Sequence, residues 1–90
     1  MPRLTTDLRN FLVMHREIVR HQLDPFRTVI LVSLARAAFR AGERKANGGP
    51  TAEYCRNAVK EQAGKMGIDV TWPGLWPVFT KDGEEVRIPF

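Results

Sequence analysis

The spacing of apolar residues along the chain changes once, close to Gly67. Before this glycine, apolar positions recur every three or four residues, which is typical of helices that bury one face. After it they alternate with polar positions, which is typical of half-buried strands. The pattern therefore predicts helices over about residues 6–22, 25–46 and 51–66, followed by strands over about residues 68–72, 77–81 and 84–88.

Local start and stop signals support these boundaries. Asp24 followed by Pro25 is typical of a helix that begins with a side-chain cap and a proline in its first turn. Residues 47–50, Asn-Gly-Gly-Pro, predict a turn between the second and third helices. Gly67 predicts a left-handed end to the third helix.

The segment after residue 76 predicts a β-hairpin about a two-residue Asp82-Gly83 turn. This turn sets the register of the two strands, which places Lys81 opposite Glu84, Phe79 opposite Val86 and Pro77 opposite Ile88. The fold class predicted is α+β, with three helices, a long central second helix and a C-terminal antiparallel hairpin that a third short strand extends.

The first predicted helix has one apolar stripe, and we expect that stripe to be half-buried. It consists of Leu8, Phe11, Leu12, Ile18 and Val19. Three arginines, Arg9, Arg16 and Arg20, fall together on a different side of the same helix.

The second predicted helix is apolar on two faces. The broader face consists of Phe26, Ile30, Leu31, Leu34, Ala37, Ala38 and Ala41. The opposite face carries Val29, Val32 and Phe39 beside Arg36 and Arg40. Because both faces must be covered, this helix is expected to be central in the fold or to form half of an interface.

Trp72 and Trp76, each followed by proline, lie between the first predicted strand and the hairpin. An isolated hairpin is marginally stable in water, so it needs a surface to pack on. We expect the two indoles to close the core between the hairpin and the second helix. Two alternatives remain open, an exposed aromatic binding site and a polyproline-type ligand for another domain.

Composition limits the classes of protein to which the chain can belong. Ninety residues with a hydrophobic fraction of 43% and a charged fraction of 27% predict a single globular domain over residues 1–90. The single cysteine, Cys55, cannot form an internal disulfide. No segment has the length of a membrane span or the apolar core of a signal peptide, so a cytoplasmic protein without membrane association is expected.

The net charge of +4 is unevenly distributed. Residues 1–45 contain nine basic and four acidic side chains, and the basic ones are almost all arginine. Arginine favours planar contacts with carboxylate or phosphate groups and is enriched at protein interfaces. The first half of the chain is therefore the half expected to contact a partner.

No combination of residues predicts catalysis or metal binding. His15 and His21 lie on different sides of the first predicted helix, and no second cysteine accompanies Cys55. Cys55 itself falls in the apolar stripe of the third predicted helix, where a thiol acts as a small apolar group. We therefore predict that the protein is not an enzyme and that it has neither cofactor nor metal.

The leading functional interpretation is a non-enzymatic protein-interaction module, an adaptor or inhibitor that occupies the surface of another protein, such as a component of a nucleic-acid-handling complex. In size and economy the chain resembles the small accessory proteins of bacteriophages that block host enzymes or defence complexes. The predicted contact residues are Arg9, Arg16, Arg20, Val29, Val32, Arg36, Phe39, Arg40 and Arg44. A homodimer through the second helix is another use of the same surface.

The alternative interpretation is a DNA- or RNA-binding domain, because three helices followed by a hairpin is the element order of a winged helix-turn-helix. The third helix would then bind the nucleic acid, with Arg56 and Lys60 as its contacts. A third interpretation assigns the arginines no role beyond keeping the chain in solution.

Overall fold

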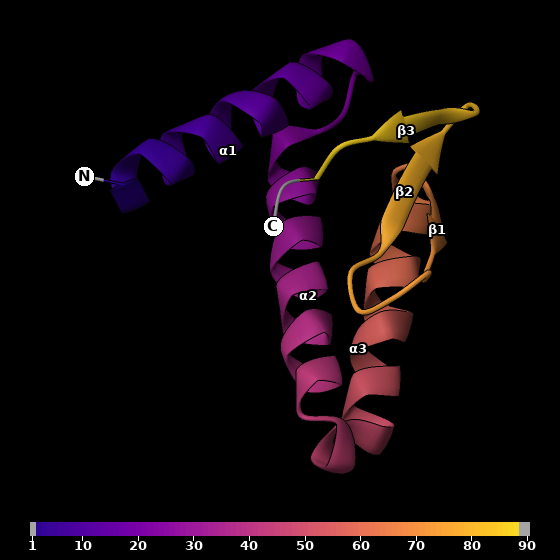
Figure 1. Ribbon diagram of the computed structural model, residues 1–90. Helices are drawn as coiled ribbons and strands as arrows, with labels where there is room; N and C mark the ends of the chain where they lie inside the picture. The colour runs from indigo at the N-terminus through magenta and orange to yellow at the C-terminus, as the bar shows by residue number, and fades with distance from the viewer. Residues whose placement is uncertain (1, 89–90) are drawn as a thin grey trace.

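The structure is a computed structural model that describes the backbone of residues 2–88 and the side chains of residues 8–44 and 51–88. Its elements are α1 (Pro2–Arg20), α2 (Pro25–Glu43), α3 (Lys45–Lys65), β1 (Asp69–Thr71), β2 (Val78–Lys81) and β3 (Glu84–Val86). Three helices are followed by one antiparallel sheet in the order β1-β2-β3, which confirms the predicted α+β class (Figure 1).

Helices α2 and α3 form an antiparallel pair, and the sheet lies beside the upper half of that pair (Figure 1). The core fills the space between these two layers. Its most buried members come from both helices and from the sheet. They include Leu31 and Ala35 of α2, Val59 and Ala63 of α3, and Phe79 and Val86 of the sheet. Small residues on α2 let α3 approach closely, as the alanines in the sequence of α2 predicted.

The hairpin has the predicted register at the two pairs nearest the turn, while Pro77 and Ile88, the third predicted pair, lie beyond the paired strands. Phe79 pairs with Val86, and Lys81 pairs with Glu84. Asp82 and Gly83 both have positive φ, 54° and 83°, as a type I′ turn requires. The two strands therefore match the local turn chemistry.

Glycine and asparagine at residues 47–50 do not form the predicted turn. Helix α2 ends at Glu43 and α3 begins at Lys45, so the backbone of residues 47–50 is helical. Intrinsic helix propensity is a weak preference, so glycine and asparagine lower the stability of a helix here without excluding one. The predicted start of the third helix near residue 51 is therefore wrong, whereas α2 ends three residues before its predicted end near residue 46.

The ends of α1 and α3 have the same geometry. At the end of α1, Leu23 N–H donates to the carbonyl of Ile18 at 2.9 Å around Gln22, which has a φ of 55°. At the end of α3, Gly67 takes the equivalent left-handed position with a φ of 72°, as predicted. Asp24 then caps α2, because its carboxylate accepts from Arg27 N–H at 3.0 Å.

The segment between β1 and β2 closes the core against α2. The rings of Trp72 and Trp76 are half-buried against the core, and Trp76 meets Phe39 edge to face with ring centroids 6.1 Å apart. Leu75 lies over Gly42, where an added Cβ would come within 2.9 Å of its side chain. The two indoles therefore close the core, and the alternatives of a freely exposed aromatic site or a polyproline-type ligand are not supported.

Within residues 2–88, none of the helices is long and apolar enough to cross a membrane.

Candidate interaction surface

Helix α1 is attached to the rest of the fold toward its C-terminal end, where two of the contacts are hydrogen bonds. The buried carboxylate of Glu17 accepts a hydrogen bond from the backbone N–H of Arg87 at 2.7 Å. The carbonyl of His21 accepts from the Nζ of Lys81, also at 2.7 Å. Along most of its length α1 lies away from the α2–α3 pair, as Figure 1 shows.

These contacts decide which side of α1 faces the body. Glu17 and His21 are buried, and Met14 and Ile18 on the same side are half-buried against the core. The apolar stripe predicted to be half-buried therefore faces outward, apart from Ile18. A buried carboxylate needs hydrogen-bond partners, and the segment after β3 supplies one to Glu17. The side of α1 that carries Glu17 is therefore the side that is buried.

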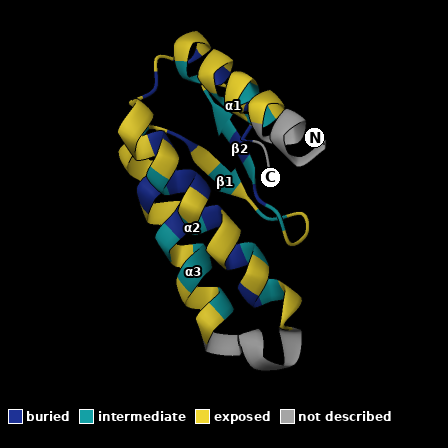
Figure 2. Cartoon of the chain, turned by 90° about the vertical axis from the view of Figure 1, so that its left-hand side faces the viewer, coloured by how far each residue is buried: buried dark blue, intermediate teal, exposed yellow. Residues whose placement is uncertain are grey.

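The outward side of α1 carries four large apolar residues, which we call the α1 row: Leu8, Phe11, Leu12 and Val19, with exposed fractions of 57%, 58%, 52% and 64%. Exposed residues run along the whole described part of this helix (Figure 2). At 100° per residue, three of the four lie within about 40° of one another. His15 continues the row, and its ring stacks on Phe11 with centroids 6.3 Å apart.

A groove of about 410 Å³ separates the first half of α1 from α2. Phe11 and Met14 line it from α1, and Val29 and Arg36 line it from α2. Val32, which is buried, also lines it. The groove and the α1 row therefore share Phe11, and the two make one continuous surface.

The burial of α2 differs from its prediction at several positions. Val29 is exposed as expected, but Val32 is buried and Phe39 is half-buried against Trp76. Phe26, predicted to face the core, is 75% exposed. The apolar surface that α2 leaves exposed therefore lies in its first turn and a half. Farther along the helix, the segment that carries Trp76 covers the surface near Phe39.

The charge around this surface is positive. Arg9, Arg16, Arg36 and Arg40 are exposed, and none makes an ion pair with another described residue. Arg20 pairs with Glu84 at 3.4 Å. On the described part of α1 the one acidic side chain is Glu17, which is turned inward. Any partner that covers the α1 row therefore meets unpaired arginines beside it.

Arg44 is also exposed, but it lies at the junction of α2 and α3, at the far end of α2 from the groove. Of the nine predicted contact residues, the structure places Val29, Val32 and Arg36 in the groove. Arg9 and Arg16 lie beside the α1 row.

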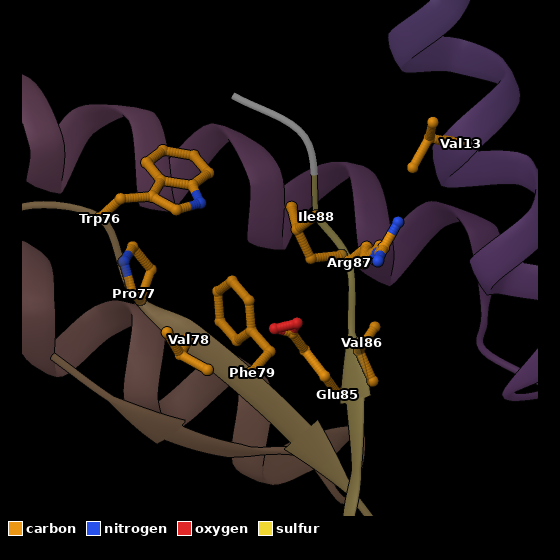
Figure 3. Close-up of a pocket in the computed structure, with 9 residues that line it drawn as sticks. All are labelled: Val13, Trp76, Pro77, Val78, Phe79, Glu85, Val86, Arg87 and Ile88. Carbon is orange, nitrogen blue, oxygen red and sulfur yellow. The ribbon is translucent and has the colours of Figure 1, made fainter. Parts of the chain in front are cut away.

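A second hollow, of about 320 Å³, lies between α1 and the hairpin (Figure 3). Val13 reaches it from α1, while Trp76, Phe79 and Val86 are among the residues on its other walls. This hollow and the groove lie on different sides of α1. The helix is therefore open on both flanks and close to the body only near its C-terminal end.

Arg56 and Lys60, the two residues predicted to contact nucleic acid, lie in different environments. Arg56 is half-buried, and its guanidinium lies 4.9 Å from the ring centroid of Trp72. This cation–π contact uses Arg56 to hold the segment between β1 and β2. Lys60 is exposed on α3, between residues of both charge signs. The structure therefore gives α3 no continuous basic face along its described side chains.

Among the residues whose side chains are described, no three histidine, cysteine, aspartate or glutamate side chains converge as a metal site would require. Cys55 is a free thiol, half-buried against the core. Comparisons with protein-family models, with curated protein sequences and with solved structures find no match. Function is therefore inferred from the surface itself.

Sequence reasoning identified the arginines and Val29 but missed the α1 row and Phe26 as surface residues. One signal was available. Glu17 and His21 are four residues apart, so they share a side of the helix with Met14 and Ile18. A helix can bury a side that carries both polar and apolar groups, in place of a purely apolar stripe, when other parts of the chain supply hydrogen-bond partners for the polar groups.

Proposed function

We propose that the protein is a non-enzymatic interaction module that binds another protein through the α1 row and the adjoining groove. The observation that supports this most strongly is the outward orientation of Leu8, Phe11, Leu12 and Val19 on one helix. Contiguous exposed apolar residues rimmed by polar ones mark protein interaction sites. In this role the protein acts as an adaptor or an inhibitor by occupying its partner's surface.

The energetics agree with a binding role. Burying a large apolar side chain completely contributes about 1.5–3 kcal/mol, so the exposed half of each member of the α1 row retains roughly 1 kcal/mol of unused burial energy. Arginine beside aromatic and aliphatic groups is also the composition of strong interface positions. Phe11 together with Arg36 across the groove provides such a combination.

The nucleic-acid alternative receives less support. It requires phosphate contacts from α3, but Arg56 is engaged with Trp72 and the tip of the hairpin carries Asp82, Glu84 and Glu85. Binding to DNA that weakens steeply with salt and depends on Lys60 would favour this alternative over the proposal.

The test is a binding experiment with matched surface variants. The immobilised protein is incubated with a nuclease-treated extract of the source cells, and each retained protein is purified and tested again alone. We expect at least one purified protein to bind wild type and to be lost with Leu8→Ser combined with Leu12→Ser. The control is Tyr54→Ser on α3, where the ring is 76% exposed and does not line the groove.

The proposal is overturned if every purified protein that binds wild type binds the double serine variant equally well. It is also overturned if the control variant loses binding to the same degree, because the loss would then not be specific to α1. Circular dichroism confirms that all three proteins are folded.

A further inference from the structure

The groove beside the α1 row has the shape and charge of a site for one more helix. It is walled by two helices, α1 and α2, and floored by the buried side chain of Val32. Grooves of this kind accept the apolar face of an amphipathic helix in many recognition domains. An extended strand, by contrast, binds at a free sheet edge.

The α1 row defines the length of such a helix. Leu8 and Val19 are eleven residues apart, and at 1.5 Å per residue the row is about 16 Å long. This corresponds to about three helical turns, so a partner helix of three or more turns covers the row completely. Its apolar positions must recur at intervals of three and four residues in order to meet the row.

The charge around the groove defines the flanks of the partner. Arg16 lines a hollow toward the hairpin with Glu84 and Glu85, so it is not a groove residue. Arg36 lines the groove and Arg9 lies beside the α1 row, both without ion-pair partners among the described residues. A partner with acidic groups beside its apolar stripe pairs with these arginines, whereas a basic partner is repelled. A second copy of this chain brings the same arginines to the interface, so charge disfavours a homodimer.

We infer that the groove between α1 and α2 binds an amphipathic helix of a partner protein whose apolar stripe is flanked by glutamate or aspartate. This inference rests on the proposed function and specifies the kind of partner. The apolar stripe contacts Phe11, Val29 and the α1 row. The acidic flanks pair with Arg36 on one side and with Arg9 on the other.

The probes are three synthetic peptides of about 20 residues, a length at which helices begin to form in water. The first carries leucines at helical spacing with flanking glutamates, the second carries lysines in place of those glutamates, and the third has the composition of the first in shuffled order. Fluorescence anisotropy measures the dissociation constant of each. We expect the glutamate peptide to bind at least tenfold more tightly than either of the others, with an affinity that falls as salt is raised.

A charge exchange gives the decisive comparison. In Arg9→Glu combined with Arg36→Glu, we expect the glutamate peptide to lose at least tenfold in affinity and the lysine peptide to gain. The matched control is Lys60→Glu combined with Lys65→Glu on α3, which changes the net charge equally and is expected to leave both affinities within twofold. Equal binding of the glutamate and lysine peptides, or equal effects of the two variants, overturns the inference.

Other occupants give different results. Sedimentation that shows a dimer of wild type but a monomer of Leu12→Glu assigns the groove to a second copy. Binding to phosphatidylserine vesicles or to a random DNA duplex that requires Arg9 and Arg36 assigns the surface to a membrane or to nucleic acid. Each of these results overturns the inference. If all three peptides fail but a purified protein still binds through Leu8 and Leu12, the proposed function stands and the acidic helix alone is wrong.

Discussion

The side-chain carboxylate of Glu17 accepts a hydrogen bond from the backbone N–H of Arg87 at 2.7 Å, across a separation of 70 residues. This contact joins the C-terminal part of α1 to the segment that follows β3. It also turns the side of α1 that contains Glu17 inward, and the α1 row of Leu8, Phe11, Leu12 and Val19 outward. The surface proposed to bind a partner therefore depends on a polar contact elsewhere on the same helix.

Replacing Glu17 is expected to weaken the fold measurably. Glu17→Ala leaves the Arg87 N–H without its acceptor, and a hydrogen bond to a charged group contributes about 1.5–3 kcal/mol. Urea denaturation should show a decrease of that size in the free energy of unfolding, and a smaller one for Glu17→Gln, which keeps an oxygen acceptor. Arg16→Ala, on the exposed side of the same helix, serves as the control and should change stability by less than about 0.5 kcal/mol. A Glu17→Ala protein as stable as the control would contradict this account of α1.

Two leucines should respond differently to the same substitution. Leu31 is completely buried between α2, α3 and the sheet, so Leu31→Ala should cost about 2–5 kcal/mol in the free energy of unfolding. Leu12 is 52% exposed on the α1 row, so Leu12→Ala should cost less than about 1 kcal/mol. Thermal denaturation of both variants compares them directly. Similar losses at the two positions would mean that α1 packs with its apolar stripe inward after all.

Two glycines near the end of α3 should give changes of opposite sign. Gly64 lies inside the helix, and a Cβ added there would meet only open space, so Gly64→Ala should stabilise the protein by up to about 1 kcal/mol through helix propensity. Gly67 has a φ of 72°, which alanine adopts only with strain, so Gly67→Ala should destabilise it by about 1 kcal/mol. Chemical denaturation measures both, and the same sign for the two changes would disprove the assigned helix end.

The segment between β1 and β2 should be essential for the core. Trp76→Ala removes the ring that meets Phe39 edge to face, so we expect a loss of about 3 kcal/mol in the free energy of unfolding and stronger binding of a hydrophobic dye. Tyr54→Ala removes an aromatic ring that is exposed on α3, and it should leave both measurements nearly unchanged. Equal effects at the two positions would show that Trp76 does not close the core.

The elements that sequence predicted best are those specified by neighbouring residues. Asp82 and Gly83 adopt positive φ because of their own chemistry, and the pairing of Phe79 with Val86 follows from that turn. Asp24 caps α2 with a side chain three residues from the N–H that it binds. No contact from a distant part of the chain is needed for either feature.

The orientation of α1 was beyond such reasoning because it depends on distant residues. Its stripe of apolar residues predicted a buried face, but the direction of burial is decided by Glu17 meeting Arg87 and by Lys81 meeting the carbonyl of His21. Phe39 is a similar case, since Trp76 covers it from a segment that is remote in sequence. Helical periodicity identifies the sides of a helix but not the environment that each side meets.

The left-handed backbone of Gln22 has a consequence for how widely the two walls of the groove open. This residue follows the end of α1 at Arg20, and α2 begins three residues later, at Pro25. Its side chain restricts the φ and ψ values available at this corner, whereas a glycine would permit many. The backbone conformation of Gln22 thus helps to fix the angle between α1 and α2, and with it the width of the groove, in the unbound protein.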